Sequence, residues 1–142
     1  ACSAFGPAID ECRRQLKIPV LKPNEVMYEE LVKKNCSASL LATFPPSIPS
    51  MVAEITDMAK AKGTDVKLNT QLVEGALAAL QGNQPDEHNR LIAELAGKQQ
   101  CDVIAFAQFS MAPALKGALA RTKTPILTTP DSAVAKLKTM LA

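Results

Sequence analysis

The chain has 142 residues, which is enough for one compact domain with its own core, and 47% of them are hydrophobic and 21% charged. This composition is typical of a globular protein and excludes an intrinsically disordered one. The 16 basic and 14 acidic residues are interspersed, and only 4% of residues are aromatic, so the chain offers no basic face or stacking surface for nucleic acid.

Membrane and metal partners are not expected either. No stretch approaches the roughly 18 consecutive apolar residues of a membrane span, and no signal peptide opens the chain, so we expect a cytoplasmic protein with a small-molecule partner. The four cysteines (Cys2, Cys12, Cys36 and Cys101) form no Cys-x-x-Cys pair, and there is a single histidine. This spacing indicates free thiols rather than a disulfide framework or a zinc site.

In the first half of the chain, apolar spacing and turn residues predict helices and strands in alternation. In chain order they are a helix over 5–17, a strand over 18–20, a helix over 25–34 capped by the segment 22–24, a strand over 37–44 and a helix over 47–62. The last of these carries the clearest apolar stripe, and Gly63 ends it as a C-cap.

The second half continues the alternation. The predicted elements are a strand over 65–68, helices over 72–80 and 85–98, a strand over 103–107, a helix over 112–122, a strand over 125–127 and a helix from 131. The continuous apolar run at 103–107 is typical of a central strand in a parallel sheet. We therefore predict an α/β protein with a parallel sheet and helices on both faces, which binds ligands outside the carboxyl ends of its strands.

Three loops follow predicted strands and are candidates for a site: residues 2–4, 43–47 and 108–110. A thiol at a helix N-terminus has a lowered pKa, which would make Cys2 a better nucleophile or proton acceptor, although Cys2 could equally be a small buried residue. Thr43 and Ser47 could offer hydroxyls to an anionic ligand, or Ser47 could simply cap its helix.

The other reactive side chains are interpreted as structural. Cys12 falls on the apolar stripe of its predicted helix, and Cys36 and Cys101 precede strands. His88 lies in a polar helix, where a solvated side chain is a better interpretation than a catalytic base.

Three segments of the chain, 2–9, 40–47 and 102–112, together resemble the aspartate/glutamate/hydantoin racemase superfamily, which includes arylmalonate decarboxylase and maleate isomerase. The resemblance implies a two-lobed fold with the active site between the lobes and with most of the first lobe missing here. It assigns residues 1–36 to the remainder of the first lobe, 37–129 to a second α/β lobe, and 130–142 to a C-terminal helix that returns to the first lobe.

The resemblance also implies a site and its partners. Cys2 is the expected catalytic cysteine, and the expected substrate contacts are Ser3, Thr43, Ser47, Gln108, Phe109 and Ser110, with the backbone amides of the last two facing an enolate-like charge. The implied substrate is a small carboxylate, no metal or organic cofactor is implied, and we expect a homo-oligomer because half a cleft would leave apolar surface exposed.

Gln108 stands where the superfamily has its second cysteine. Racemisation by two bases needs a proton acceptor on one face of the α-carbon and a donor on the other, and glutamine can be neither. We therefore expect an isomerase of the racemase type that acts at the α-carbon through one thiol, with racemisation itself in doubt. A decarboxylase or cis-trans isomerase of the same fold, and a non-catalytic small-molecule binding protein, remain the alternatives.

Overall fold

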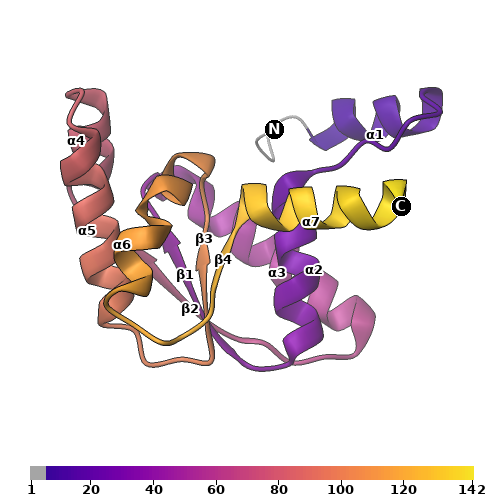
Figure 1. Ribbon diagram of the computed structural model, residues 1–142. Helices are drawn as coiled ribbons and strands as arrows, with labels where there is room; N and C mark the ends of the chain where they lie inside the picture. The colour runs from indigo at the N-terminus through magenta and orange to yellow at the C-terminus, as the bar shows by residue number, and fades with distance from the viewer. Residues whose placement is uncertain (1–5) are drawn as a thin grey trace.

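The computed structural model describes residues 6–142 as a parallel four-stranded sheet flanked by helices (Figure 1). The strands, in the spatial order β2-β1-β3-β4, are β1 (Ser37–Ala42), β2 (Lys67–Leu72), β3 (Val103–Phe106) and β4 (Ile126–Thr128). The helices are α1 (Gly6–Gln15), α2 (Pro23–Lys34), η2 (Pro45–Ser47), α3 (Ile48–Lys62), α4 (Ala76–Gln81), α5 (Pro85–Gly97), η3 (Phe109–Ala114), α6 (Leu115–Leu119) and α7 (Thr129–Leu141). Among these described residues, no helix is long and apolar enough to cross a bilayer.

Both faces of the sheet are covered by helices, as predicted. Successive side chains of a strand point to opposite faces, so Leu40 and Ala105 pack against α2 and α3, while Leu41 and Ile104 pack against α5 and α6. All the residues of β3 are buried, and this agrees with the unbroken run of apolar residues in its sequence. The α/β prediction is confirmed, and the strands end at the edge where a ligand site is expected.

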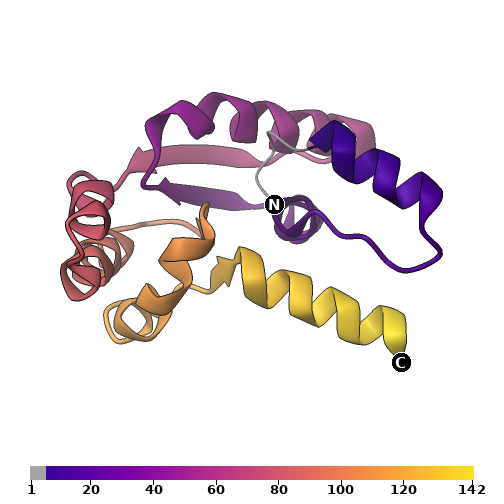
Figure 2. The same cartoon turned by 90° about the horizontal axis from the view of Figure 1, so that it is seen from above.

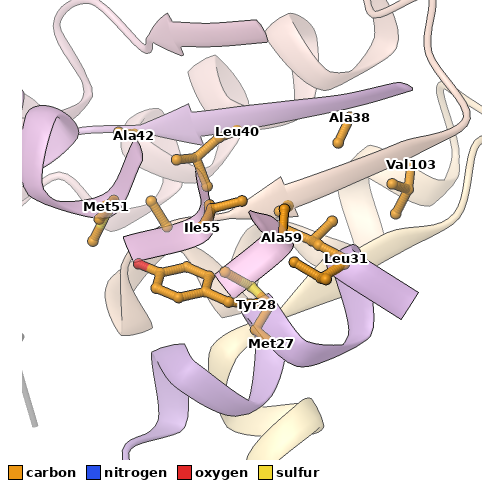
Figure 3. Close-up of a cluster of buried hydrophobic side chains, with 13 residues drawn as sticks. Met27, Tyr28, Leu31, Ala38, Leu40, Ala42, Met51, Ile55, Ala59 and Val103 are labelled. Atoms are coloured by element: carbon orange, nitrogen blue, oxygen red, sulfur yellow. The ribbon is translucent and has the colours of Figure 1, made fainter. Parts of the chain in front are cut away.

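Helix α2 belongs to the core under one face of the sheet. Tyr28 and Leu31 from α2 meet Met51 and Ile55 from α3 beside Leu40 of β1 (Figure 3). Helix α7 packs against α2 and extends beyond the sheet, as α1 does (Figure 2). Helix α2 and the sheet thus share one core. The boundary between a first and a second lobe at residue 36 stays a prediction.

The pairing of β1 with β3 continues past the amino end of β3, where Asp102 meets Ser37, the first residue of β1. The Ser37 backbone N–H and hydroxyl donate to Oδ2 of Asp102 at 2.9 and 2.7 Å, and the Asp102 N–H donates to the Ser37 carbonyl at 3.1 Å. These hydrogen bonds lower the pKa of the Asp102 carboxyl below its ordinary value, the hydroxyl contributing most. A side chain thus joins two segments that are 65 residues apart in the chain.

The strand predicted at 18–20 is wrong. This segment is a connection between α1 and α2, with Ile18 67% exposed, and it pairs with no strand of the sheet. Pro19 also lacks the N–H that strand pairing would use. Polar contacts hold the connection instead: Arg13 donates to the Val20 carbonyl at 2.8 Å and to Glu25 at 2.7 Å. Helix α1 ends at Gln15 rather than at residue 17.

The boundaries predicted around β2 are also wrong. The strand runs from Lys67 to Leu72 rather than over 65–68, and the following helix begins only at Ala76. Strand β2 lies at the edge of the sheet, so polar residues such as Asn69 and Gln71 alternate along it and mask the apolar signal. Gly75, in the left-handed region at φ 76°, separates strand from helix.

Two side chains lie in environments opposite to those predicted. His88 is only 1% exposed rather than solvated, and its Nδ1 lies 3.1 Å from Oδ1 of Asn89. Cys12 is exposed, because α1 lies beside the first turn of α2 rather than on the sheet. The apolar spacing in α1 therefore marks no core face, and the polar sequence around His88 hides a core position.

The Asp102 bridge predicts a pH-dependent contribution to stability. Because the folded pKa is depressed, this contribution is present above the unfolded value of about 3.9 and is lost as pH falls through the folded value. We expect Asp102→Ala to lower the urea midpoint at pH 6, and the difference from wild type to shrink at pH 3. An equal difference at both pH values would contradict this, and Asp57→Ala, on the exposed surface of α3, is the control.

Candidate functional site

Two predicted site residues, Thr43 and Gln108, lie side by side at the carboxyl edge of the sheet. The β1–β3 register pairs Leu41 with Phe106, and the Ala107 N–H still donates to the Leu41 carbonyl at 2.9 Å. Two residues further along the same register, Thr43 lies level with Gln108. The alignment of two buried strands therefore determines which loop residues meet.

The Gln108 side chain continues the pairing where the backbone ladder stops. Its Oε1 accepts a hydrogen bond from the Thr43 backbone N–H at 2.9 Å and a longer one from the Thr43 hydroxyl at 3.4 Å. Its Nε2 donates to Oγ of Ser47 at 3.0 Å. We call these contacts the Gln108 clamp, and they join the loop after β3 to both ends of the loop after β1.

The chemistry of the carboxamide suits this position. Exchanging its oxygen and nitrogen would place an NH₂ group against the Thr43 N–H donor, so the hydrogen bonds require the orientation described. The Ser47 hydroxyl accepts from Gln108 and donates to the Phe44 carbonyl at 2.8 Å. Ser47 occupies the N-cap position of α3, as the alternative interpretation predicted, but its hydroxyl makes no capping bond to the helix.

A pocket of about 130 Å³ opens beside the clamp. Its lining residues are uncharged and come from α2, the loop after β1, α3 and the loop after β3: Asn24, Phe44, Ser47, Met51, Ala107, Gln108 and Phe109. Met51 and Ala107 are buried, whereas Phe44 and Phe109 remain 46% and 45% exposed. The two phenylalanines therefore form walls that reach into solvent, above a buried floor.

The structure brings together four of the predicted site residues, Thr43, Ser47, Gln108 and Phe109. Ser110 lies in η3 next to Phe109 but does not line the pocket. Cys2 and Ser3 lie outside the described residues, so their predicted roles stay predictions. Within residues 6–142, no three His, Cys, Asp or Glu side chains gather as metal ligands.

Two residues at this edge were not predicted from the sequence. Asn24 is 8% exposed and lines the pocket. The sequence predicted that the segment 22–24 caps α2, but the Asn24 side chain makes no capping hydrogen bond. Glu74 follows β2 and lines a separate hollow together with Thr43. Correct assignment of β2, whose carboxyl end is Leu72, would have placed Glu74 at this edge; Asn24 carries no comparable signal in the sequence.

A scan against protein-family models and a search of curated proteins found no match. Among solved structures, the chain resembles a glutamate racemase from Bacillus anthracis with a TM-score of 0.66 and 12% sequence identity. The alignment covers 98% of this chain and 55% of the racemase, so the chain spans about half the length of that protein. The racemase-like fold expected from the sequence resemblance is thereby confirmed.

The clamp predicts a measurable loss of stability when its carboxamide is removed. Gln108→Leu leaves the Thr43 N–H, on a residue only 3% exposed, without its acceptor, and we expect a cost of about 1–3 kcal/mol in urea unfolding. Gln100→Leu, which changes an exposed glutamine, should cost much less. Equal effects of the two substitutions would contradict a structural role for the Gln108 carboxamide.

Proposed function

We propose that the protein is a cofactor-independent enzyme of the aspartate/glutamate racemase superfamily, acting at the α-carbon of a small carboxylic acid through the thiol of Cys2. The observation that carries the proposal is the Gln108 clamp. It gathers Thr43, Ser47 and Gln108, which were selected from the sequence as site residues, beside a pocket at the carboxyl edge of a racemase-like fold. Activity, substrate and the homo-oligomeric state are all part of this proposal.

The contacts of Gln108 support chemistry with a single thiol. A carboxamide is neither an acid nor a base near neutral pH, and both ends of this one already engage Thr43 and Ser47. Gln108 would therefore position the two loops rather than act as the second base that racemisation needs. The backbone N–H groups of Phe109 and Ser110, at the start of η3, would face the negative charge that develops on the substrate.

In this scheme the Cys2 thiolate removes the α-proton, which leaves a thiol and an enediolate. The thiol then returns a proton to the carbanion carbon on the face from which it came. Exchange of the thiol with solvent between the two steps labels the α-carbon without inverting it. A decarboxylase of the same fold would reach the same enediolate by losing CO₂, and the Cys2 thiol would supply the proton.

The test is α-proton exchange in D₂O, followed by proton NMR with a panel of small 2-substituted carboxylic acids. We expect exchange with at least one acid, and its loss in Cys2→Ala, because no other group in the proposed site would hold the transferred proton. Cys12→Ala is the matched control, since this thiol is exposed on α1.

Exchange that survives Cys2→Ala would contradict the catalytic role of the thiol. Absence of exchange and of decarboxylation across the panel, with ligand binding retained, would favour the non-catalytic binding protein instead.

A further inference from the structure

The pocket beside the Gln108 clamp has the polarity of a site for an apolar group. No Lys, Arg, Asp or Glu is among its lining residues, and its apolar lining residues are Phe44, Met51, Ala107 and Phe109. Its volume of about 130 Å³ is close to that of apolar protein cavities of about 150 Å³ that take up benzene. A phenyl or branched aliphatic group matches this space in size and polarity.

The polar atoms at the floor of the pocket are already used within the protein. The carboxamide of Gln108 is engaged by Thr43 and Ser47, and the Ser47 hydroxyl donates to the Phe44 carbonyl. A charged ligand group placed against these engaged atoms would lose its hydration and gain neither an ionic partner nor a free hydrogen-bond donor, which is unfavourable. The floor therefore disfavours a second carboxylate, such as the side chain of an acidic amino acid.

Asn24 is the exception among the polar lining residues. It is 92% buried, since its exposed fraction is 8%, and its side-chain amide makes no hydrogen bond within the described part of the chain. Although the residue is largely buried, its amide nitrogen and oxygen keep some accessible surface, so a ligand in the pocket can reach them. Its NH₂ group is available to donate to an oxygen of a ligand seated in the pocket.

We propose that this pocket binds a small monocarboxylate with an uncharged aliphatic or aromatic side chain, with Asn24 donating to its carboxylate and with Phe44, Met51 and Phe109 enclosing the side chain. This inference rests on the function proposed above, because it names the substrate class of the same site. The binding itself depends only on the described residues and does not require turnover.

The test uses phenylacetate and glutarate as probes, titrated into ¹⁵N-labelled protein and followed by NMR. We expect phenylacetate to bind at least tenfold more tightly than glutarate, with shifts centred on the backbone amides of Phe44, Ser47, Gln108 and Phe109. Equal or tighter binding of glutarate, or shifts centred elsewhere, would overturn the proposal.

Asn24→Asp is the informative variant, because an acidic residue is favourable in the first turn of α2 and the change preserves size. It should remain folded, with a melting temperature somewhat below that of the wild type because the new carboxylate has no cationic partner in the lining. It should lose phenylacetate affinity more than tenfold, since it replaces a donor by a negative charge. Asn69→Asp, on exposed β2, is the control and should bind as wild type does. A folded Asn24→Asp protein with wild-type affinity would overturn the role of Asn24.

The binding test and the α-proton exchange test can give opposite results, so a failure of this inference can be distinguished from a failure of the proposed function. Phenylacetate binding without any exchange would leave this inference standing and contradict the proposed activity. Cys2-dependent exchange of an acidic amino acid, with no phenylacetate binding, would support the activity and overturn the substrate class.

Discussion

The pairing of β1 with β3 is the interaction on which the rest of the structure depends. It joins segments 65 residues apart, and a side chain extends it at each end: Asp102 at the amino edge of the sheet and Gln108 at the carboxyl edge. The same register that buries Leu41 beside Phe106 sets Thr43 level with Gln108. The alignment of the core strands therefore also determines the geometry of the candidate site, and a slip in register would disrupt both.

A glutamine in the clamp links architecture to chemistry. Its carboxamide supplies an acceptor for the Thr43 N–H and a donor for Ser47, which no thiol could do with comparable strength. The same group cannot take or give a proton at neutral pH. If the proposed activity is correct, proton transfer falls to Cys2 alone, while the second loop holds the substrate. The uncharged pocket beside the clamp fits this division, because it offers packing surface and the amide of Asn24 rather than a second base.

Much of this arrangement could be predicted from the sequence, because buried parallel strands are continuous apolar runs and their carboxyl ends lie at one edge. Thr43, Ser47 and Gln108 were found in this way. The edge strand β2 was misplaced because its polar residues alternate, and Glu74 was missed with it. His88 and Asn24 could not be recognised, since polar sequence gives no sign of a burial that depends on how distant helices pack. The apolar run at 18–20 was misplaced because so short a run also occurs in an exposed connection between two helices.

The central claim, that the Gln108 clamp holds the two site loops together, is tested most directly by amide hydrogen exchange at Thr43. The account predicts that the Thr43 N–H exchanges slowly in wild type and much faster in Gln108→Leu. The Val73 N–H, which donates to the Ala42 carbonyl at 2.8 Å on the other side of β1, should keep its rate in both proteins. Fast exchange at Thr43 in wild type, or equally slow exchange in the variant, would contradict the account.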